Sequence, residues 1–286
     1  MTETPINITI YHSPDSDDAF MFYGLVSGAV KYPGFNFDHS LCDIETLNHR
    51  TVKGELDVTA VSVHAYAYLK GRYFIMNSGA SMGGQDYGPK LVATKNVDIK
   101  SRRVIAIPGV LTSAALALRM YLKENNVNAE LMNVSFDKVG DVVKEGKADA
   151  GVIIHEGQLT HDREGLYNLV DLGKWWWDET GLPLPLGVNV VRKDLGSRSI
   201  VACSTVLRQT IQYSLDHRKE ALEYALKYGR GISVDEADKF VGMYVNDLTL
   251  DLGQAGKRSI ELFLQRAKDL QLISPEINAE FVKEEL

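Results

Sequence analysis

Short runs rich in β-branched and aromatic residues alternate along the chain with longer runs of helical periodicity. Such alternation predicts parallel α/β sheets whose strands are joined by crossover helices. Asp17 and Asp18 suit the first turn of the first helix, where the helix dipole stabilises negative charge. In the first third of the chain the predicted strands are 6–12, 35–41, 57–63, 74–78 and 91–95, and the predicted helices are 17–30, 43–56 and 64–70.

A second cycle of strands and helices begins near residue 102. From Ser197 onward the pattern is almost continuously helical. Two α/β cycles followed by helices predict two lobes with a cleft between them, and ligands in open α/β sheets bind beyond the carboxyl ends of strands. The second cycle has predicted strands at 102–109, 129–135 and 149–156 and helices at 112–125 and 136–147, and the later helices are 197–231, 235–250 and 254–270.

The strand predicted at 149–156 ends on a titratable pair, His155 and Glu156, after three aliphatic residues. Two interpretations of His155 are open. It is either a core histidine satisfied by a backbone carbonyl, or a general base, for which an imidazole pKa of about 6.5 is suited. Glu156 is expected on the opposite face of the strand, as a salt-bridge or loop residue.

Thr112 and Ser113 lie in PGVLTSAAL (108–116), between a predicted strand and a predicted helix. The simpler interpretation is an N-cap, in which a hydroxyl accepts from a backbone N–H of the first turn. The functional alternative is an anion site, where the two hydroxyls and the free N–H groups of the helix bind a substrate carboxylate.

Two further loops carry candidate chemistry that local structure explains more simply. GASMGGQDYGP (79–89) lacks both the ending of a P-loop and the GxGxxG pattern, so we expect tight turns or a close approach to a ligand instead of nucleotide binding. SPDSDDAF (13–20) has three acids without EF-hand spacing, which favours helix capping over a metal site. The tryptophans at 175–177 cannot share one helical face, so at least one is expected to be exposed or to face the cleft.

Composition excludes several classes of protein. With a net charge of −7 and a pI near 5.5, the chain lacks the basic surface that nucleic acids require. No apolar run approaches the length of about 20 residues that a membrane span needs. The first 20 residues lack a signal-peptide pattern, and two distant cysteines predict no disulfide framework. These features favour a cytoplasmic protein that binds a small molecule, with no nucleic-acid or membrane partner.

Several segments together resemble the 1,4-dihydroxy-6-naphthoate synthase family, which acts in the futalosine pathway of menaquinone biosynthesis. The resemblance follows nearly the whole chain in order, and HEG followed by TGLPLPLG is its most specific part. The matching segments are IAIPGVLTSAAL (105–116), DAGVIIHEGQLT (149–160), DLGKWWWDETGLPLPLG (171–187), HRKEALEYALKYGRG (217–231) and FVGMYVNDLTLDLG (240–253).

The resemblance implies a periplasmic-binding-protein-like α/β fold of type II, with two lobes and a central cleft. Residues 1–95 and 193–286 would form the first lobe and residues 96–192 the second. It also implies a carbon–carbon lyase that converts cyclic dehypoxanthine futalosine, a small molecule carrying a carboxylate, without a metal or redox cofactor. The implied proton acceptor is His155, and the implied substrate-binding residues are Ala60, Val61, Ser62, Thr112 and Ser113.

The chain departs from the family pattern at two places. Ala60 stands where the family usually has Lys, and SPDSDDAF replaces the usual Ser-Pro-Cys-Pro-Asn-Asp, which adds acid near the predicted cleft. A paralogue with an altered substrate is therefore one open alternative. A two-lobed solute-binding protein or sensor and the related chorismate dehydratase are two others, and a homodimer is one of the open assembly states.

Overall fold

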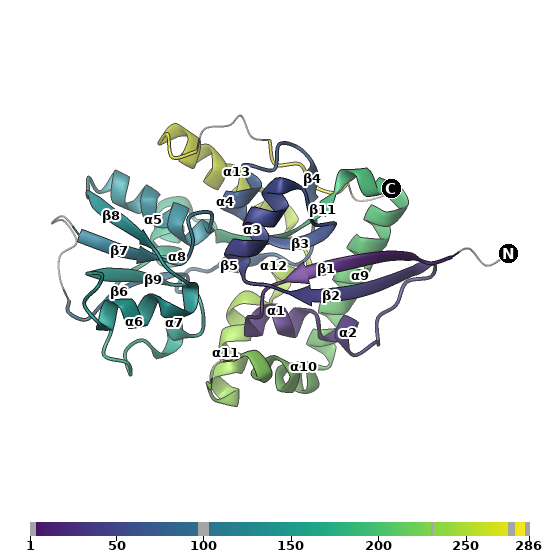
Figure 1. Ribbon diagram of the computed structural model, residues 1–286, viewed down its shortest axis with the longest axis horizontal. Helices are drawn as coiled ribbons and strands as arrows, with labels where there is room; N and C mark the ends of the chain where they lie inside the picture. Colours follow the sequence, from purple (N-terminus) through teal and green to yellow (C-terminus); the bar gives the residue numbers. More distant parts are fainter. Residues whose placement is uncertain (1–3, 97–102, 230, 274–277, 284–286) are drawn as a thin grey trace.

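The computed structural model describes residues 4–96, 103–229, 231–273 and 278–283. Residues 1–3, 97–102, 230, 274–277 and 284–286, which fall within the predicted lobe ranges, lie outside the described residues. Two β-sheets form the centres of two lobes that lie side by side (Figure 1). Within the described residues, no helix is both long enough and apolar enough to cross a membrane.

The first lobe is built on a sheet with the strand order β2-β1-β3-β11-β4, and β5 pairs with β11. Helices from both ends of the chain cover this sheet (Figure 1). Its strands are β1 Ile6–His12, β2 Phe35–Leu41, β3 Val58–Ser62, β4 Tyr73–Ile75, β5 Ser81–Gly83 and β11 Leu184–Arg192. Its helices are α1 Ser16–Met21, α2 Tyr23–Val26, α3 Ile44–Lys53, α4 Val63–Tyr66, α9 Gly196–Asp216, α10 Arg218–Ala225, α11 Val234–Tyr244, α12 Asp247–Leu250 and α13 Gly253–Asp269.

The second lobe is built on a sheet with the order β10-β6-β9-β7-β8. Its strands are β6 Lys90–Ala93, β7 Arg103–Ile107, β8 Ala129–Asn133, β9 Ala150–Ile153 and β10 Tyr167–Asp171. Its helices are α5 Ser113–Glu124, α6 Val139–Lys144, α7 Gly157–Thr160 and α8 Leu172–Thr180. Single 3₁₀ turns occupy Phe136–Lys138, Lys193–Leu195 and Leu226–Tyr228.

The expectation of parallel sheets is right for only part of each sheet. β1 runs parallel to β2 and β3, and β7 runs parallel to β8 and β9. β6 and β11, however, run antiparallel to all their neighbours. These are the strands through which the chain enters the second lobe and returns from it, so neither follows a crossover helix within its own sheet.

The lobe to which each of these two strands belongs differs from the prediction. β6 (90–93) belongs to the second sheet although the predicted boundary at 95 assigned it to the first lobe. β11 (184–192) belongs to the first sheet although the predicted boundary at 192 assigned it to the second. Each crossing strand pairs with strands that are distant in sequence, and its local sequence pattern does not indicate which sheet it joins. This explains why both predicted boundaries are wrong.

One of the hydrophobic clusters of the described residues runs through both lobes. The largest cluster joins Val61 and Ile75 of the first sheet to Leu91 and Ile105 of the second. Trp176 of α8 is fully buried in this cluster and meets Phe263 of α13 edge to face, with ring centroids 5.4 Å apart. The two lobes are therefore joined by shared packing as well as by the connecting strands.

Local capping signals fix the two helices that border the cleft. Asp43 at the N-cap of α3 accepts from the backbone N–H of Thr46 at 3.0 Å, and Gly54 ends the helix at a φ of 82°. Thr112 accepts from the backbone N–H of Ala115 at 3.2 Å and so caps α5, as its position in PGVLTSAAL predicted. Both helix starts are thereby held at defined positions beside the cleft.

Candidate active site

A cavity of about 110 Å³ lies between the lobes. Ligand pockets usually measure at least about 300 Å³, so this cleft is nearly closed and the lobes would have to separate to admit a ligand of ordinary size. Lining residues come from both lobes: Ser13, Asp15, Asp17, Asp18, Ile44, Ala60, Ser62, Gly79, Ser81, Pro89, Thr112, Ser113, Ala114, Ile154, Leu186, Gly187, Val188, Phe240 and Tyr244.

Strand β3 presents alternate residues to the cavity. Ala60 and Ser62 line it, whereas the side chain of Val61 is fully buried in the core. Gly79, from the glycine-rich segment, also lines the cavity with a φ of 83°, and the side-chain amide of Asn189 donates to its carbonyl. The predicted close approach of this segment to a ligand site thus agrees with its position.

Thr112 and Ser113 line the cavity at the start of α5, but both hydroxyl protons are already engaged. Thr112 Oγ1 donates to the Gly109 carbonyl at 2.8 Å while capping the helix. Ser113 Oγ donates to the Leu186 carbonyl at 2.6 Å and accepts from the backbone N–H of His64 at 3.2 Å. Because each hydroxyl has one proton, neither can donate to a ligand without breaking an existing bond.

Ser62 differs from Thr112 and Ser113. Its hydroxyl oxygen accepts from the side-chain amide of Asn48 at 3.0 Å, while Asn48 Oδ1 accepts from the Ser62 backbone N–H at 2.8 Å. Ser62 stands at the N-cap of α4 but makes no capping bond with its side chain. Its hydroxyl proton therefore has no acceptor among the described residues.

His155 follows β9, which ends two residues earlier at Ile153. Its side chain is 16% exposed and meets the ring of Phe136 edge to face. Of the described residues in this segment, Ile154 lines the cavity, whereas His155, the next residue, is not part of the lining. The imidazole is thus neither sealed in the core nor in contact with the cavity in this closed conformation.

The backbone after His155 fixes the protonation of its ring. The Gly157 N–H donates to Nδ1 at 3.0 Å, so the neutral imidazole carries its proton on Nε2. A Cβ on residue 157 would lie 2.7 Å from His155 Cε1, so only glycine lets the ring fold over this turn. The glycine of the HEG motif is therefore explained by the position of the histidine ring.

Glu156 connects the lobes. Its side chain is only 2% exposed, and it accepts from the Ser16 hydroxyl of α1 at 2.8 Å. It also lies 3.9 Å from His155 Nδ1. The interpretation of Glu156 as a salt-bridge or loop residue missed this buried hydrogen bond between the lobes, because its partner is 140 positions away in the sequence.

The acidic segment faces the same cavity. Burial, then the neighbouring carboxylates of Asp18 and Asp15, raises the pKa of Asp17 well above its ordinary value. Burial and Asp15 raise the pKa of Asp18 to about 6, although its carboxylate accepts from the Ser13 backbone N–H. Asp15 at the N-cap makes no capping bond with its side chain, so capping does not account for all three acids.

The described lining of the cavity has acidic side chains but no basic ones. Three aspartates line it, and none of its described lining residues is Lys, Arg or His. Ala60, where the resemblance leads one to expect Lys, contributes to this absence of cations. A carboxylate bound in this cavity would therefore have to be held by neutral donors and by the N-terminus of α5.

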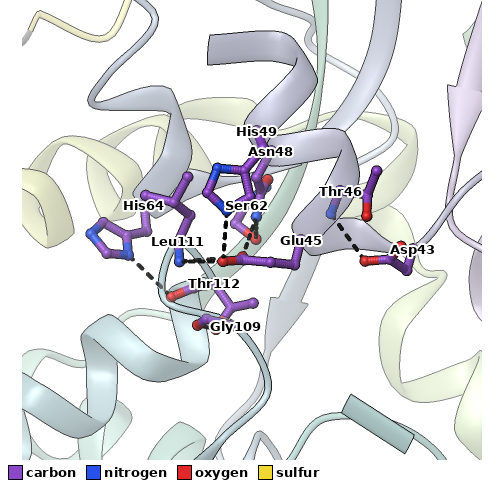
Figure 2. A network of polar contacts seen from close by, with 10 residues as sticks. All are labelled: Asp43, Glu45, Thr46, Asn48, His49, Ser62, His64, Gly109, Leu111 and Thr112. Carbon is purple, nitrogen blue, oxygen red and sulfur yellow. Dashed lines mark hydrogen bonds and ion pairs between the residues drawn. The ribbon is translucent and has the colours of Figure 1, made fainter. Parts of the chain in front are cut away.

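A polar network joins α3 of the first lobe to the loop before α5 (Figure 2). The Leu111 backbone N–H donates to both oxygens of the Glu45 carboxylate at 3.2 Å, and His49 Nε2 lies 3.3 Å from Glu45 Oε1. A Cβ on Gly109 would lie 2.5 Å from Glu45 Oε2. Glu45 thus holds the two lobes together at one border of the cleft.

His64 makes a second connection at the same border. Its Nδ1 lies 3.2 Å from the Thr112 carbonyl, which must accept, so Nδ1 carries the proton (Figure 2). The ring is buried, and burial lowers its pKa to about 4. The backbone and ring of His64 therefore both position the start of α5.

Other sequence features lie away from the cavity. Of the three tryptophans, Trp176 is core and Trp175 and Trp177 are half-buried, and none belongs to the lining. Among the described residues, no group of three or more His, Cys, Asp or Glu side chains could hold a metal ion.

Sequence reasoning missed Glu45, Asn48 and two cavity residues of α11, Phe240 and Tyr244. Asn48 carried one usable signal, since a polar residue on the buried face of an amphipathic helix needs a specific partner. Phe240 and Tyr244 match ordinary core spacing, and only the packing of α11 against the cleft reveals their position.

The comparison with known proteins places this geometry in a family. The model of a family described as Menaquinone biosynthesis matches residues 8–269. A 1,4-dihydroxy-6-naphthoate synthase of Thermus thermophilus is 37% identical over 94% of this chain and 97% of its own. A second protein with that name, from Streptomyces coelicolor, is 32% identical over 91% of this chain and 92% of its own.

Solved structures agree with the fold. A protein of Archaeoglobus fulgidus has a TM-score of 0.87 and 38% identity, covering 93% of this chain and 98% of its own. The alkanesulfonate-binding protein of Xanthomonas axonopodis has a TM-score of 0.71 at 11% identity, covering 95% and 96%. The second likeness concerns the fold alone, and it confirms the expected periplasmic-binding-protein-like architecture.

Proposed function

Since the chain belongs to the menaquinone biosynthesis family, we propose that it is a 1,4-dihydroxy-6-naphthoate synthase, a carbon–carbon lyase acting on cyclic dehypoxanthine futalosine. The observation that carries the proposal is the 37% identity to a synthase of that name over nearly the whole of both chains. A cleft between two lobes, with acids and hydroxyls along it, supports the proposal. We place the reaction in the cytoplasm.

In this proposal His155 removes a proton from the bound substrate, a carbon–carbon bond breaks to release a small sugar-derived fragment, and the six-membered ring that remains becomes the aromatic ring of the naphthoate. A base needs a free lone pair, and in the tautomer that this contact favours the lone pair is on Nδ1, where the Gly157 N–H occupies it. Releasing a hydrogen bond of this kind costs about 1 kcal/mol. General-base assistance typically increases the rate about 10²–10⁴-fold, and the free energy that corresponds to this increase is larger than the cost of the hydrogen bond.

Movement of the lobes would bring His155 to the substrate. The cavity of about 110 Å³ is small for the substrate, and its lining includes Ile154 but not His155. A substrate entering between the lobes would shift the 154–157 turn, which belongs to the second lobe. Closure around the bound substrate also excludes water from the reacting atoms.

The proposed substrate contacts follow from the lining. The carboxylate would lie at Ser62 and the first turn of α5, which offer neutral donors, and Ala60 adds no charge to the lining beside them. Thr112 and Ser113 would act mainly by shaping that helix start, and Val61 acts only through its place in β3. The chemistry needs no cofactor, since aromatisation supplies the driving force.

The test is turnover of purified protein. Cyclic dehypoxanthine futalosine is incubated without added cofactor, and naphthoate formation is followed by liquid chromatography and mass spectrometry. We expect steady product formation that falls at least about 100-fold in His155→Gln, whereas His161→Gln, a matched histidine variant in the same segment, stays near wild type. Stoichiometric binding with unchanged substrate would indicate a solute-binding protein, and conversion of chorismate would indicate a dehydratase.

A further inference from the structure

The hydroxyls of the cavity are not equivalent. Thr112 and Ser113 each donate their proton to a backbone carbonyl, and Ser13 donates to Asp15 Oδ2 at 3.0 Å. Ser62 and Ser81 are the lining residues whose hydroxyl protons have no acceptor among the described residues. Only these two can donate to a ligand at no cost to the fold.

Asn48 distinguishes Ser62 from Ser81. Asn48 is fully buried on α3 and makes two bonds to Ser62, one to the hydroxyl oxygen and one to the backbone N–H. Because its amide nitrogen can only donate, the Ser62 oxygen is fixed as an acceptor on that side. The Ser62 proton must then point elsewhere, and the residue, only 4% exposed, faces the cavity.

A buried hydroxyl proton without an acceptor is unusual in a folded protein, because it loses its bonds to water and gains none. Ser62 ends β3 directly before α4, and the cavity that it lines is the place left for its acceptor. The carboxyl groups of the described lining belong to three aspartates, which repel a ligand carboxylate wherever they are ionised, so a neutral donor such as Ser62 suits that carboxylate better.

We infer that Asn48 is a positioning residue that commits the Ser62 hydroxyl to donate to the substrate carboxylate. The inference rests on the proposed function and deepens it, since it says which hydroxyl holds the carboxylate and why. Thr112 and Ser113 then hold the helix start in place, and Ser62 makes the directional contact. Asn48 itself touches no substrate.

Asn48→Asp tests the direction of this bond. The substitution keeps one oxygen to accept from the Ser62 backbone, but it replaces the amide donor by an acceptor. The Ser62 hydroxyl would then turn and donate to the new carboxylate, and the substrate would lose its donor. We expect KM to rise about tenfold with kcat little changed, as for Ser62→Ala, because a contact made equally in ground and transition states is lost.

The decisive measurement is a double-mutant cycle on turnover of cyclic dehypoxanthine futalosine. In Ser62→Ala protein, Asn48→Asp should cause no further rise in KM, because the hydroxyl through which it acts is absent. Ser81→Ala is the matched control, since it removes a hydroxyl from the same cavity that Asn48 does not touch. In Ser81→Ala protein, Asn48→Asp should raise KM by the same factor as it does in the wild type.

A carboxylate at position 48 would also face Glu45, whose Oε2 lies 3.5 Å from Asn48 Nδ2. The same cycle is therefore run in Glu45→Gln protein, where this repulsion is absent, and each variant is checked by thermal melting. A full additional rise in KM in Ser62→Ala protein, or a loss confined to kcat, would overturn the inference. Absence of turnover in the wild type would instead contradict the proposed function.

Discussion

The buried imidazole of His64 makes the stability of the protein depend on pH in a calculable way. Burial lowers its folded-state pKa from 6.5 to about 4, with nearby Arg119 adding to the effect and the bond to the Thr112 carbonyl opposing it. Between these two pKa values His64 is mostly protonated in the unfolded chain and mostly neutral in the folded chain. The stability due to neutral His64 is therefore complete above pH 6.5 and is lost as the pH falls towards 4.

The size of the effect follows from the two pKa values. One pKa unit corresponds to about 1.4 kcal/mol, so the shift amounts to about 3 kcal/mol in total. Between pH 7 and pH 5 the loss is about 2 kcal/mol, because the unfolded imidazole is almost fully protonated at pH 5 while the folded one is still mostly neutral.

His64→Asn isolates this contribution. The asparagine amide can still donate to the Thr112 carbonyl, but it does not titrate. Urea unfolding of both proteins at pH 7, 6 and 5 gives the difference in their free energies of unfolding, and groups such as Asp17 and Asp18 cancel in that difference. We expect the wild type to lose about 2 kcal/mol relative to the variant on going from pH 7 to pH 5. A difference that stays constant with pH would refute the reasoning.

Three further predictions concern the borders of the cleft. Gly157→Ala places a Cβ 2.7 Å from His155 Cε1 and should displace the ring, so kcat falls at least about tenfold while the melting temperature changes little; equal kcat would contradict the assigned ring position. Gly109→Ala places a Cβ 2.5 Å from Glu45 Oε2 at a φ of 149°, and should lower the free energy of unfolding by about 1–3 kcal/mol in urea titrations, whereas an unchanged value would count against the contact. The wild type should become more stable as the pH falls through about 6 towards 3.8, because folded Asp18 takes up a proton more readily than unfolded Asp18. Asp18→Asn removes this dependence, so the variant should have the higher melting temperature at pH 8 and a smaller increase in melting temperature on acidification. Melting temperatures that change in parallel with pH in both proteins would contradict the raised pKa.

Local sequence was sufficient for several elements, whereas the predicted helix 17–30 is two short helices that end at Val26 and the predicted strand 149–156 ends at Ile153. The predicted strands 6–12 and 35–41 agree with β1 and β2 to the residue, and the predicted helix 112–125 agrees with α5 to within one residue at each end. Their signals are alternating burial, helical periodicity and a capping threonine, all of which act over a few positions. The resemblance added the family and the fold, since it compares the order of motifs along the whole chain.

Tertiary structure alone decided how the candidate site is arranged. Sequence placed Thr112, Ser113 and His155 near a cleft, but the hydroxyl of Ser113 depends on Leu186, 73 positions away, and Asn48 binds Ser62 across 14 positions. Which hydroxyl keeps a free proton is set by such partners. A hydrogen bond assigns a proton to one acceptor only, and local pattern cannot show which acceptor the fold will bring within reach.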